Sequence, residues 1–429
     1  MKMVKQYIKQ ALYQLKEDKL ISLVSVIGTA LAICMIMVIV LVLQVRVVDS
    51  VPEVNRSRSL YVKSMSVRMK GDTSGNSSNG GMSVVTAREC FKALTTPEVV
   101  TVMSINEKVR ASVPGGNKMT ADKLETDEAF WKVFQFQFID GKPYSSAAFS
   151  SGLPQAVISE TVARRIYGTT DVVGQTLQLN HADYTVTGVV KEVSKLATAS
   201  YAQIWIPYTS TETTQLVWWG TVMGAMRVVI LARSPDDFPI IRAEVDKLRQ
   251  QYNSGLKDSE VFYRGQPDTQ FVYLYRKWGQ AQPDTVMLLL RFALIIAVLL
   301  LVPAINLSSM TLSRMRKRMG EMGIRKAFGA TANELLRQVF LESLLLTLLA
   351  GVLGLGLSYV TTFLLSDFLF GNSENTARMG SFSLAGDMLL SPLLFLAAFG
   401  FCLLLNLLSA GIPAWRVSRM NITDALNQR

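Results

Sequence analysis

Four long runs along the chain contain only uncharged, mostly apolar side chains, and the segments between them are polar and mixed. The runs are Leu20–Val45, Phe292–Ser313, Ser343–Ser366 and Met388–Trp415. A helix needs about 20 apolar residues to cross a bilayer, so each run is long enough. Buried core helices of a soluble protein are the alternative, and four runs of this length argue against it. The pattern predicts an integral membrane α-helical protein with four transmembrane helices.

The first run could also belong to a cleaved signal peptide, because lysines precede it and Ala30-Leu31-Ala32 resembles a cleavage site. Apolar sequence continues past that site through Cys34–Leu43, which favours an uncleaved anchor. Before the run, Val4, Ile8 and Leu15 recur at helical spacing beside several lysines. This spacing predicts an amphipathic helix at the cytoplasmic membrane surface, with a simple extension of the first span as the alternative.

Lysine and arginine are unevenly distributed among the segments that connect the runs. They gather in residues 1–19, 314–342 and 416–429, whereas residues 367–387 carry only Arg378. Basic residues favour the cytoplasmic side of a membrane, so both termini and 314–342 are predicted to be cytoplasmic and 46–283 to lie outside. The net charge of +11 therefore reflects membrane sidedness, and no nucleic-acid partner is expected.

Hydropathy and charge together define the organisation of the chain. In order, the predicted segments are a cytoplasmic amphipathic helix (1–19), transmembrane helix 1 (20–45), a large mixed α+β extracytoplasmic domain inserted between the first and second helices (46–283), transmembrane helix 2 (284–313), a cytoplasmic coupling loop (314–342), transmembrane helix 3 (343–366), a short extracytoplasmic loop (367–387), transmembrane helix 4 (388–415) and a cytoplasmic tail (416–429).

Within residues 46–283, short strand signals alternate with helix signals. Ser159 is a good N-cap for a helix that runs to Tyr167. Thr176–Leu179 and Tyr184–Val190 predict two strands of a hairpin. Pro235 opens a helix-like stretch that continues to Tyr252. These signals predict the mixed α+β character of the extracytoplasmic domain.

The same domain offers little reactive chemistry. The stretch Gly71–Gly81, GDTSGNSSNGG, has no apolar side chain and predicts a flexible loop. Cys90 is the only cysteine outside the spans, so we expect a small buried side chain and no intramolecular disulfide. The single histidine, His181, falls in the hairpin turn without the companions that a metal site needs. No nucleophile elbow or defensible carboxylate pair stands out, so neither a catalytic nor a metal site is predicted.

Small residues recur every four positions in two of the spans. Gly28 and Ala32 do so in the first span, and Ala350, Gly354 and Ser358 do so in the third. Rows of small side chains let helix backbones approach closely. We therefore predict that these faces pack against other helices, either of this chain or of a second copy.

Residues 314–342 carry several helix start and stop signals. Glu321 and Arg325 stand four apart in the order that favours a helical ion pair. Gly329 is a stop signal, and Thr331-Ala332-Asn333-Glu334 fits the capping box that begins a new helix. The pattern predicts a short helix, a sharp turn and a second helix continuous with the third span. Such an element could pass a push from a cytoplasmic protein to the membrane, or it could be an interfacial helix that only anchors the loop.

Several motifs resemble those of one known family. The run Arg318–Gly329, RMGEMGIRKAFG, resembles the signature loop of the FtsX/MacB-like ABC-transporter permeases. The ending Pro413–Arg416 through Asp424–Leu426 is similar to the ending of that family. The segments outside the membrane that resemble the MacB-type extracytoplasmic domain are Ile139–Pro143, Ala156–Ser159 with Tyr167-Gly168, Val173-Gly174 and Thr187–Val189. The resemblance covers nearly the whole chain in the right order.

The resemblance implies a permease subunit that pairs with a second copy of itself or a related permease and docks ABC ATPase subunits under the cytoplasmic loop. Carried over by position, the implied ATPase-coupling residues are Glu321, Gly323, Ile324, Arg325, Lys326, Gly329 and Ala330. We add the hypothesis that Ile324 and Phe328 fill a cleft on the ATPase. No Gly-x-x-x-x-Gly-Lys-Ser/Thr phosphate loop occurs in the sequence, so ATP and Mg are expected in a partner chain, with no cofactor and no enzymatic activity in this one.

The resemblance leaves the substrate open. Drugs, peptides and lipoproteins fit the family, with a periplasmic adaptor and an outer-membrane duct as possible further partners besides membrane lipid. A non-transporting regulator of a cell-wall hydrolase, as in the FtsX-like members, is the alternative. A ligand sensor would need a cytoplasmic signalling domain, and the predicted cytoplasmic segments are too short to form one. The expected location is the bacterial cytoplasmic (inner) membrane.

Overall fold

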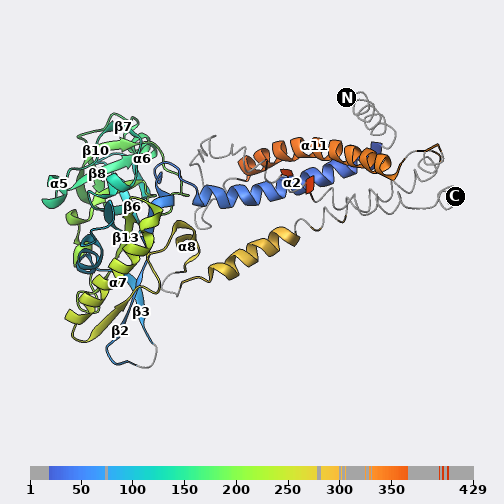
Figure 1. Cartoon of the computed structure of the whole chain (residues 1–429). Coiled ribbons are helices and arrows are strands. Elements are labelled where there is room, and N and C mark those ends of the chain that lie inside the picture. Colours follow the sequence, from blue (N-terminus) through green and yellow to red (C-terminus); the bar gives the residue numbers. More distant parts are fainter. Residues whose placement is uncertain are drawn as a thin grey trace. The chain divides into compact units, whose positions relative to one another are not determined.

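The computed structural model describes residues 19–72, 76–277, 282–298, 301, 305, 324, 328–329, 331–365, 396, 399–400 and 403–404. The chain divides into two compact units (Figure 1). Val45–Thr285 form what we call the globular unit, and the other described residues form the helical unit. The predicted extracytoplasmic domain, 46–283, has nearly the bounds of the globular unit.

Long apolar helices make up the described part of the helical unit. They are α2 (Lys19–Val47), α11 (Ala332–Leu364) and a shorter helix over Thr285–Val298. Among the described residues, one helix is long and apolar enough to cross a membrane, through Leu344–Thr362 with a mean hydropathy of 2.0. The apolar parts of the other two, Val26–Val42 and Thr285–Val298, are shorter. Most of the predicted fourth span lies outside the described residues.

The globular unit is built on one large, strongly bent sheet. Its path runs β11-β8-β10-β9-β5-β6-β4-β13-β3-β2-β14, with β1, β12 and β7 attached at its sides. The strands are β1 (Ser59–Val62), β2 (Met65–Met69), β3 (Ser78–Met82), β4 (Val99–Ser104), β5 (Glu107–Ser112), β6 (Lys118–Thr126), β7 (Phe138–Gly141), β8 (Gln155–Ser159), β9 (Thr176–Leu179), β10 (Ala182–Val190), β11 (Ile204–Pro207), β12 (Met223–Gly224), β13 (Met226–Leu231) and β14 (Ser259–Phe262). Because β11 also pairs with β6, six strands close into a ring.

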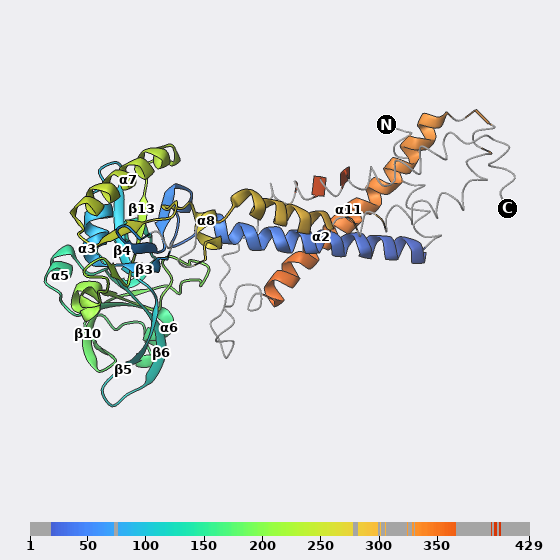
Figure 2. The same ribbon diagram turned by 90° about the horizontal axis from the view of Figure 1, so that it is seen from below.

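Short helices cover this sheet. They are α3 (Val84–Ala87), the π-helix η2 (Arg88–Lys92), α4 (Phe130–Val133), α5 (Ser146–Ser150), α6 (Glu160–Tyr167), α7 (Phe238–Gly255) and α8 (Gln270–Tyr275), with 3-10 turns at Arg56–Arg58, Tyr208–Ser210, Glu212–Gln215 and Pro235–Asp237. In Figure 2, α3 and α7 lie on one half of the unit and α6 lies on the other half beside β5, β6 and β10.

Each half of the globular unit has its own apolar core. In the half that carries α7, Ile241 and Val245 of this helix pack on buried residues of β2, β3 and β13. In the ring half, Val162 and Ile166 of α6 pack against β8, β10 and β11. An aromatic cluster around Phe130 and the fully buried Trp205 lies in a third core. Burial of apolar surface, rather than disulfides, therefore accounts for the stability of this unit.

Several local predictions are confirmed. Ser159 caps α6, because its side chain accepts a hydrogen bond from the amide of Val162, and the helix ends at Gly168 with φ of 80°. The hairpin of β9 and β10 turns at Asn180 and His181, which both have positive φ and match the right-handed twist of the strands. The helix predicted from Pro235 begins as a 3-10 turn with a capping box at Ser234 and continues as α7.

The prediction of a flexible loop over Gly71–Gly81 was wrong for its second half. Ser78–Met82 form β3, which pairs with β2 on one side and with β12 and β13 on the other. The neighbouring strands leave no room for a side chain at the end of this run. A Cβ on Gly81 would lie 2.6 Å from the carbonyl oxygen of Gly224, closer than real Cβ atoms come.

Candidate functional site

The predicted coupling loop contains a turn shortly before the start of α11. The amide of Phe328 donates to the carbonyl of Ile324 at 3.0 Å, and Gly329 follows with φ of 95°. The side chain of Thr331 accepts from the amide of Glu334, and the Glu334 carboxylate accepts from the amide of Thr331 at 2.9 Å. The capping box that the sequence predicted is therefore formed. Thr331 also lowers the pKa of Glu334 through these hydrogen bonds.

Two large apolar side chains are exposed at this turn. The exposed fraction is 89% for Phe328 and 51% for Ile324. Both lie next to the start of α11, a helix of 33 residues that continues through the apolar segment without interruption. An exposed apolar pair on such a turn can bind a protein surface. Five other predicted coupling residues lie outside the described residues: Glu321, Gly323, Arg325, Lys326 and Ala330.

The small residues of α11 lie against α2 within the helical unit. Ala350 and Ser358 are fully buried, and a Cβ on Gly354 would lie 2.7 Å from the carbonyl oxygen of Ala30. The thiol of Cys34 on α2 lies 3.7 Å from the hydroxyl of Thr361. On α2, Ala32 is buried and Gly28 is half-buried. The two helices thus meet at close range, and pairing of these faces with a second copy stays a prediction.

This close approach leads to a prediction. Gly354→Ile should separate α2 from α11, because its side chain would overlap Ala30 and Ile33, and overpacking costs about 1–3 kcal/mol. In a chain that carries only Thr361→Cys and Cys402→Ala, oxidation should form a disulfide between positions 34 and 361. Adding Gly354→Ile should strongly reduce the cross-linked fraction measured on a gel. Gly356→Ile is the matched control, since nothing lies within 4 Å of its Cβ position. Equal cross-linking in both variants would contradict the contact.

A second feature is the junction where the chain enters the globular unit. Glu53 and Arg56 form an ion pair at 2.7 Å, and both side chains are almost fully buried. The Glu53 carboxylate also accepts from the amides of Ala199 and Ser200, and Arg56 donates to the carbonyl of Leu196. The incoming segment, Val45–Arg58, is therefore fixed to the loop between β10 and β11.

The outgoing segment, Arg264–Arg276, is fixed in the same way. Asp268 and Arg276 form a buried bidentate ion pair, with side chains 1% and 0% exposed. Asp268 also exchanges two backbone hydrogen bonds with Tyr61 of β1, each 2.8 Å long. Tyr61 in turn stacks on Tyr273 of α8, with ring centroids 4.7 Å apart. Burial raises the pKa of Asp268, and Arg276 opposes that rise.

The contacts of Asp268 connect the outgoing segment to β1, the strand that directly follows the incoming segment. Tyr61 belongs to β1, which pairs along its length with β13 in the middle of the sheet. The amide side chain of Gln270, in the outgoing segment, donates to the carbonyl of Arg46 in the incoming segment at 3.1 Å. A displacement of either segment would thus act on the sheet and not on a slack linker. Neither ion pair is predicted from the sequence, because no local pattern marks it.

The described part of the chain shows no group of metal-ligating side chains. Cys90 is fully buried, and burial raises the pKa of its thiol to about 11, so the thiolate that a reaction would need is scarce at neutral pH.

The chain therefore combines apolar helices with a globular unit of mixed α and β structure. The model of the MacB-like periplasmic core domain matches residues 22–248, and the model of the FtsX-like permease C-terminal domain matches residues 293–422. The chain belongs to the family of MacB/FtsX-like ABC transporter permeases.

Curated relatives are similar over much of the chain. The uncharacterized ABC transporter permease YknZ of Bacillus subtilis (strain 168) is 24% identical over 260 residues, which cover 59% of this chain and 62% of the relative. The macrolide export ATP-binding/permease protein MacB 1 of Yersinia pestis is 24% identical over 315 residues, 73% of this chain and 44% of the relative. The chain thus spans less than two thirds of the length of these relatives.

Two solved structures are also similar. The extracellular domain of the noncanonic ABC-type transporter YknZ from Gram-positive bacteria has 15% identity and a TM-score of 0.35, covering 46% of this chain and 99% of that chain. The periplasmic region of MacB from Actinobacillus actinomycetemcomitans has 15% identity and a TM-score of 0.34, covering 47% of this chain and 89% of that chain.

Proposed function

We propose that this chain is the membrane subunit of an ABC transporter and passes ATP-driven movement of a partner ATPase to its globular unit. The observation that carries the proposal is the exposed pair Ile324 and Phe328 on a turn shortly before the start of α11. A long helix is stiff along its axis, so a push at the turn would displace the membrane-spanning segment as one body. ATP and Mg would be bound by the ATPase and not by this chain.

In this proposal four helices cross the bacterial inner membrane, both termini and residues 314–342 are cytoplasmic, and the globular unit lies outside. Movement of the spans would reach the sheet through the incoming and outgoing segments, whose buried ion pairs Glu53–Arg56 and Asp268–Arg276 leave little slack. Two permease chains would assemble with the ATPase subunits. Three implied coupling residues would fix the register of docking: Glu321, Arg325 and Lys326.

The substrate would be exported or expelled on the outer side. The name of the MacB relative, a macrolide export protein, supports a drug-like molecule, and a peptide or a lipoprotein fits the same mechanism. The match of residues 22–248 to the MacB-like core domain supports export over regulation of a cell-wall hydrolase. A periplasmic adaptor and an outer-membrane duct would complete the export path.

Association and sidedness test this proposal directly. Co-expressed with an ABC ATPase subunit of the same bacterium, the tagged chain should retain the ATPase through detergent purification, and its presence should change the rate of ATP hydrolysis. Single cysteines at Asn76, in the globular unit, and at Ser418 should react with a membrane-impermeant maleimide on opposite sides of the membrane. Absence of any bound ATPase, or labelling of both cysteines from one side, would contradict the proposed function.

A further inference from the structure

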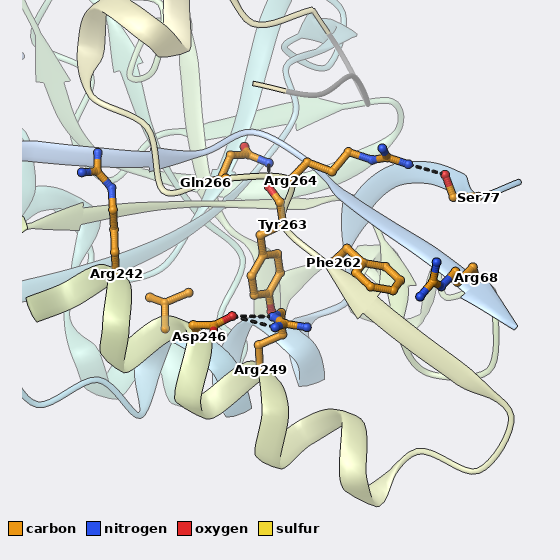
Figure 3. Close-up of a pocket in the computed structure, with 11 residues that line it drawn as sticks. Arg68, Ser77, Arg242, Asp246, Arg249, Phe262, Tyr263, Arg264 and Gln266 are labelled. Atoms are coloured by element: carbon orange, nitrogen blue, oxygen red, sulfur yellow. Dashed lines mark hydrogen bonds and ion pairs between the residues drawn. The ribbon is translucent and has the colours of Figure 1, made fainter. Parts of the chain in front are cut away.

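A cavity of about 510 Å³ opens between α7 and the strands β2 and β14 of the globular unit. Four of its lining residues are arginines, which come from three separate stretches of the chain: Arg68, Arg242, Arg249 and Arg264. Figure 3 shows Arg242 at one end of the cavity and Arg68 at the other, with Phe262 and Tyr263 between them. This volume is in the range of small-molecule sites.

The charge in this cavity is not balanced. Its lining includes a single carboxylate, Asp246, which is paired with Arg249 at 2.6 Å. Arg68 is paired with Glu260 at 3.2 Å. Among the residues that the structure describes, no carboxylate lies within ion-pair distance of Arg242 or Arg264. Both guanidinium groups are exposed and have no ion-pair partner among these residues, although the Asp268 carboxylate attracts Arg242 from beyond ion-pair distance. The lining therefore carries an excess of positive charge, which favours an anion in the cavity.

The two unpaired arginines are held in position by neutral groups. Arg264 donates from Nε to the hydroxyl of Ser66 at 2.6 Å and from Nη2 to the hydroxyl of Ser77 at 2.7 Å. Its backbone φ of 48° lies in the left-handed region that residues other than glycine rarely adopt. Arg242 donates from Nε to the carbonyl of Pro267 at 3.1 Å, which leaves its terminal N–H groups for another acceptor. Pre-positioned guanidinium groups bind an oxyanion with less loss of side-chain entropy.

The rest of the cavity lining is partly apolar. Val245 is fully buried, Tyr263 is 4% exposed, and Phe262 is half-buried. The guanidinium of Arg68 lies over the ring of Phe262, 4.3 Å from its centroid. A ligand that fits both parts of the lining has an anionic group for the arginines and an apolar or aromatic body for the rings.

We propose that this cavity binds a phosphomonoester carried on an apolar or aromatic body. A phosphate offers three acceptor oxygens and carries nearly two negative charges at neutral pH, which suits several guanidinium groups better than a carboxylate does. The site forms entirely within the globular unit, so it does not depend on the proposed coupling to an ATPase. Free phosphorylated molecules and lipid headgroups share this chemistry.

Calorimetric titration of the full-length chain in phosphatidylcholine nanodiscs tests the site. The probes are phenyl phosphate, inorganic phosphate, benzoate, and the short-chain lipids dihexanoyl phosphatidic acid and dihexanoyl phosphatidylcholine. We expect saturable binding of phenyl phosphate, much weaker binding of benzoate, and tightening as the pH rises through about 6, where the second phosphate proton is lost. Tighter binding of the phosphatidic acid than of phenyl phosphate would identify a lipid headgroup as the source, and the reverse order a free phosphorylated molecule.

Substitutions locate the binding. Arg242→Gln with Arg264→Gln should weaken phenyl phosphate binding by about tenfold or more, since each charge-assisted hydrogen bond contributes substantially. The single variant Arg242→Gln serves as the test if the double variant does not fold. The terminal N–H groups of Arg242 are not used within the described fold, so this substitution should leave the fold intact. Arg110→Gln is the matched control, an exposed arginine of β5 outside the cavity. No saturable binding of any phosphate probe, equal binding of benzoate, or an unchanged affinity in Arg242→Gln would overturn the proposal.

Discussion

Replacement of Ile324 and Phe328 by aspartate is expected to reduce stimulation of the partner ATPase by at least about tenfold, while the chain still inserts into the membrane. Both side chains are exposed, so the substitutions remove no internal contact that the described structure shows. If they fill an apolar cleft on the ATPase, each aspartate would place a charge where water is excluded. A buried aromatic anchor alone often contributes 2 kcal/mol or more to binding, and about 1.4 kcal/mol corresponds to a factor of ten.

The measurement is ATP hydrolysis by the ATPase with each permease variant in nanodiscs, together with the amount of ATPase that co-purifies. Ile240→Asp is a matched control, because Ile240 is 56% exposed on α7 of the globular unit and should face no ATPase. Stimulation that survives the double substitution would show that this turn is not the docking element. Loss of stimulation in the Ile240 control as well would point to a general defect in the chain.

Replacement of Arg276 by methionine is expected to destabilise the globular unit by about 3–5 kcal/mol. The change removes both hydrogen bonds to the Asp268 carboxylate and one to the carbonyl of Arg264, and it leaves a buried charge without its partner. Urea unfolding of the detergent-solubilised chain, followed by tryptophan fluorescence, measures this effect. Five of the six tryptophans, including the buried Trp205, lie within Val45–Thr285.

The loss of stability in Arg276→Met should depend on pH, and the direction of this dependence follows from the pKa of Asp268. Burial raises the pKa of Asp268 above its ordinary value of 3.8, so the folded protein holds the proton more tightly than the unfolded chain does. In Arg276→Met the guanidinium group no longer opposes this rise, so the pKa of Asp268 in the folded protein should rise further. The loss of stability in Arg276→Met should therefore be largest near neutral pH and should shrink as the pH is lowered toward about 4.

Two further variants distinguish the effect of breaking the buried ion pair from the effect of removing an arginine charge in general. Arg164→Met breaks an exposed pair with Glu160 on α6 and should cost about 0.5 kcal/mol or less. Arg276→Met combined with Asp268→Asn should recover part of the stability, because no charge is then left buried. An equal cost for Arg276→Met and Arg164→Met would rule out a structural role for the buried pair.

The sequence by itself determined those features that depend on neighbouring residues. The apolar run from Leu20 predicted α2, and the run from Ser343 predicted the continuation of α11. The caps at Ser159 and Thr331 and the turn at Asn180 were equally predictable. Each signal lies within a few residues of the structure that it specifies, since capping, turn formation and helical hydrophobicity are short-range effects.

Only the tertiary structure decided the features that join distant parts of the chain. Gly81 became part of a strand because β2, β12 and β13 approach it, although its own neighbourhood resembles a loop. Asp268 meets Tyr61 across more than two hundred residues, and the cavity brings Arg68 next to Arg264 over a similar separation. The physical reason is that strand pairing and charge burial are set by partners whose positions exist only once the sheet has formed.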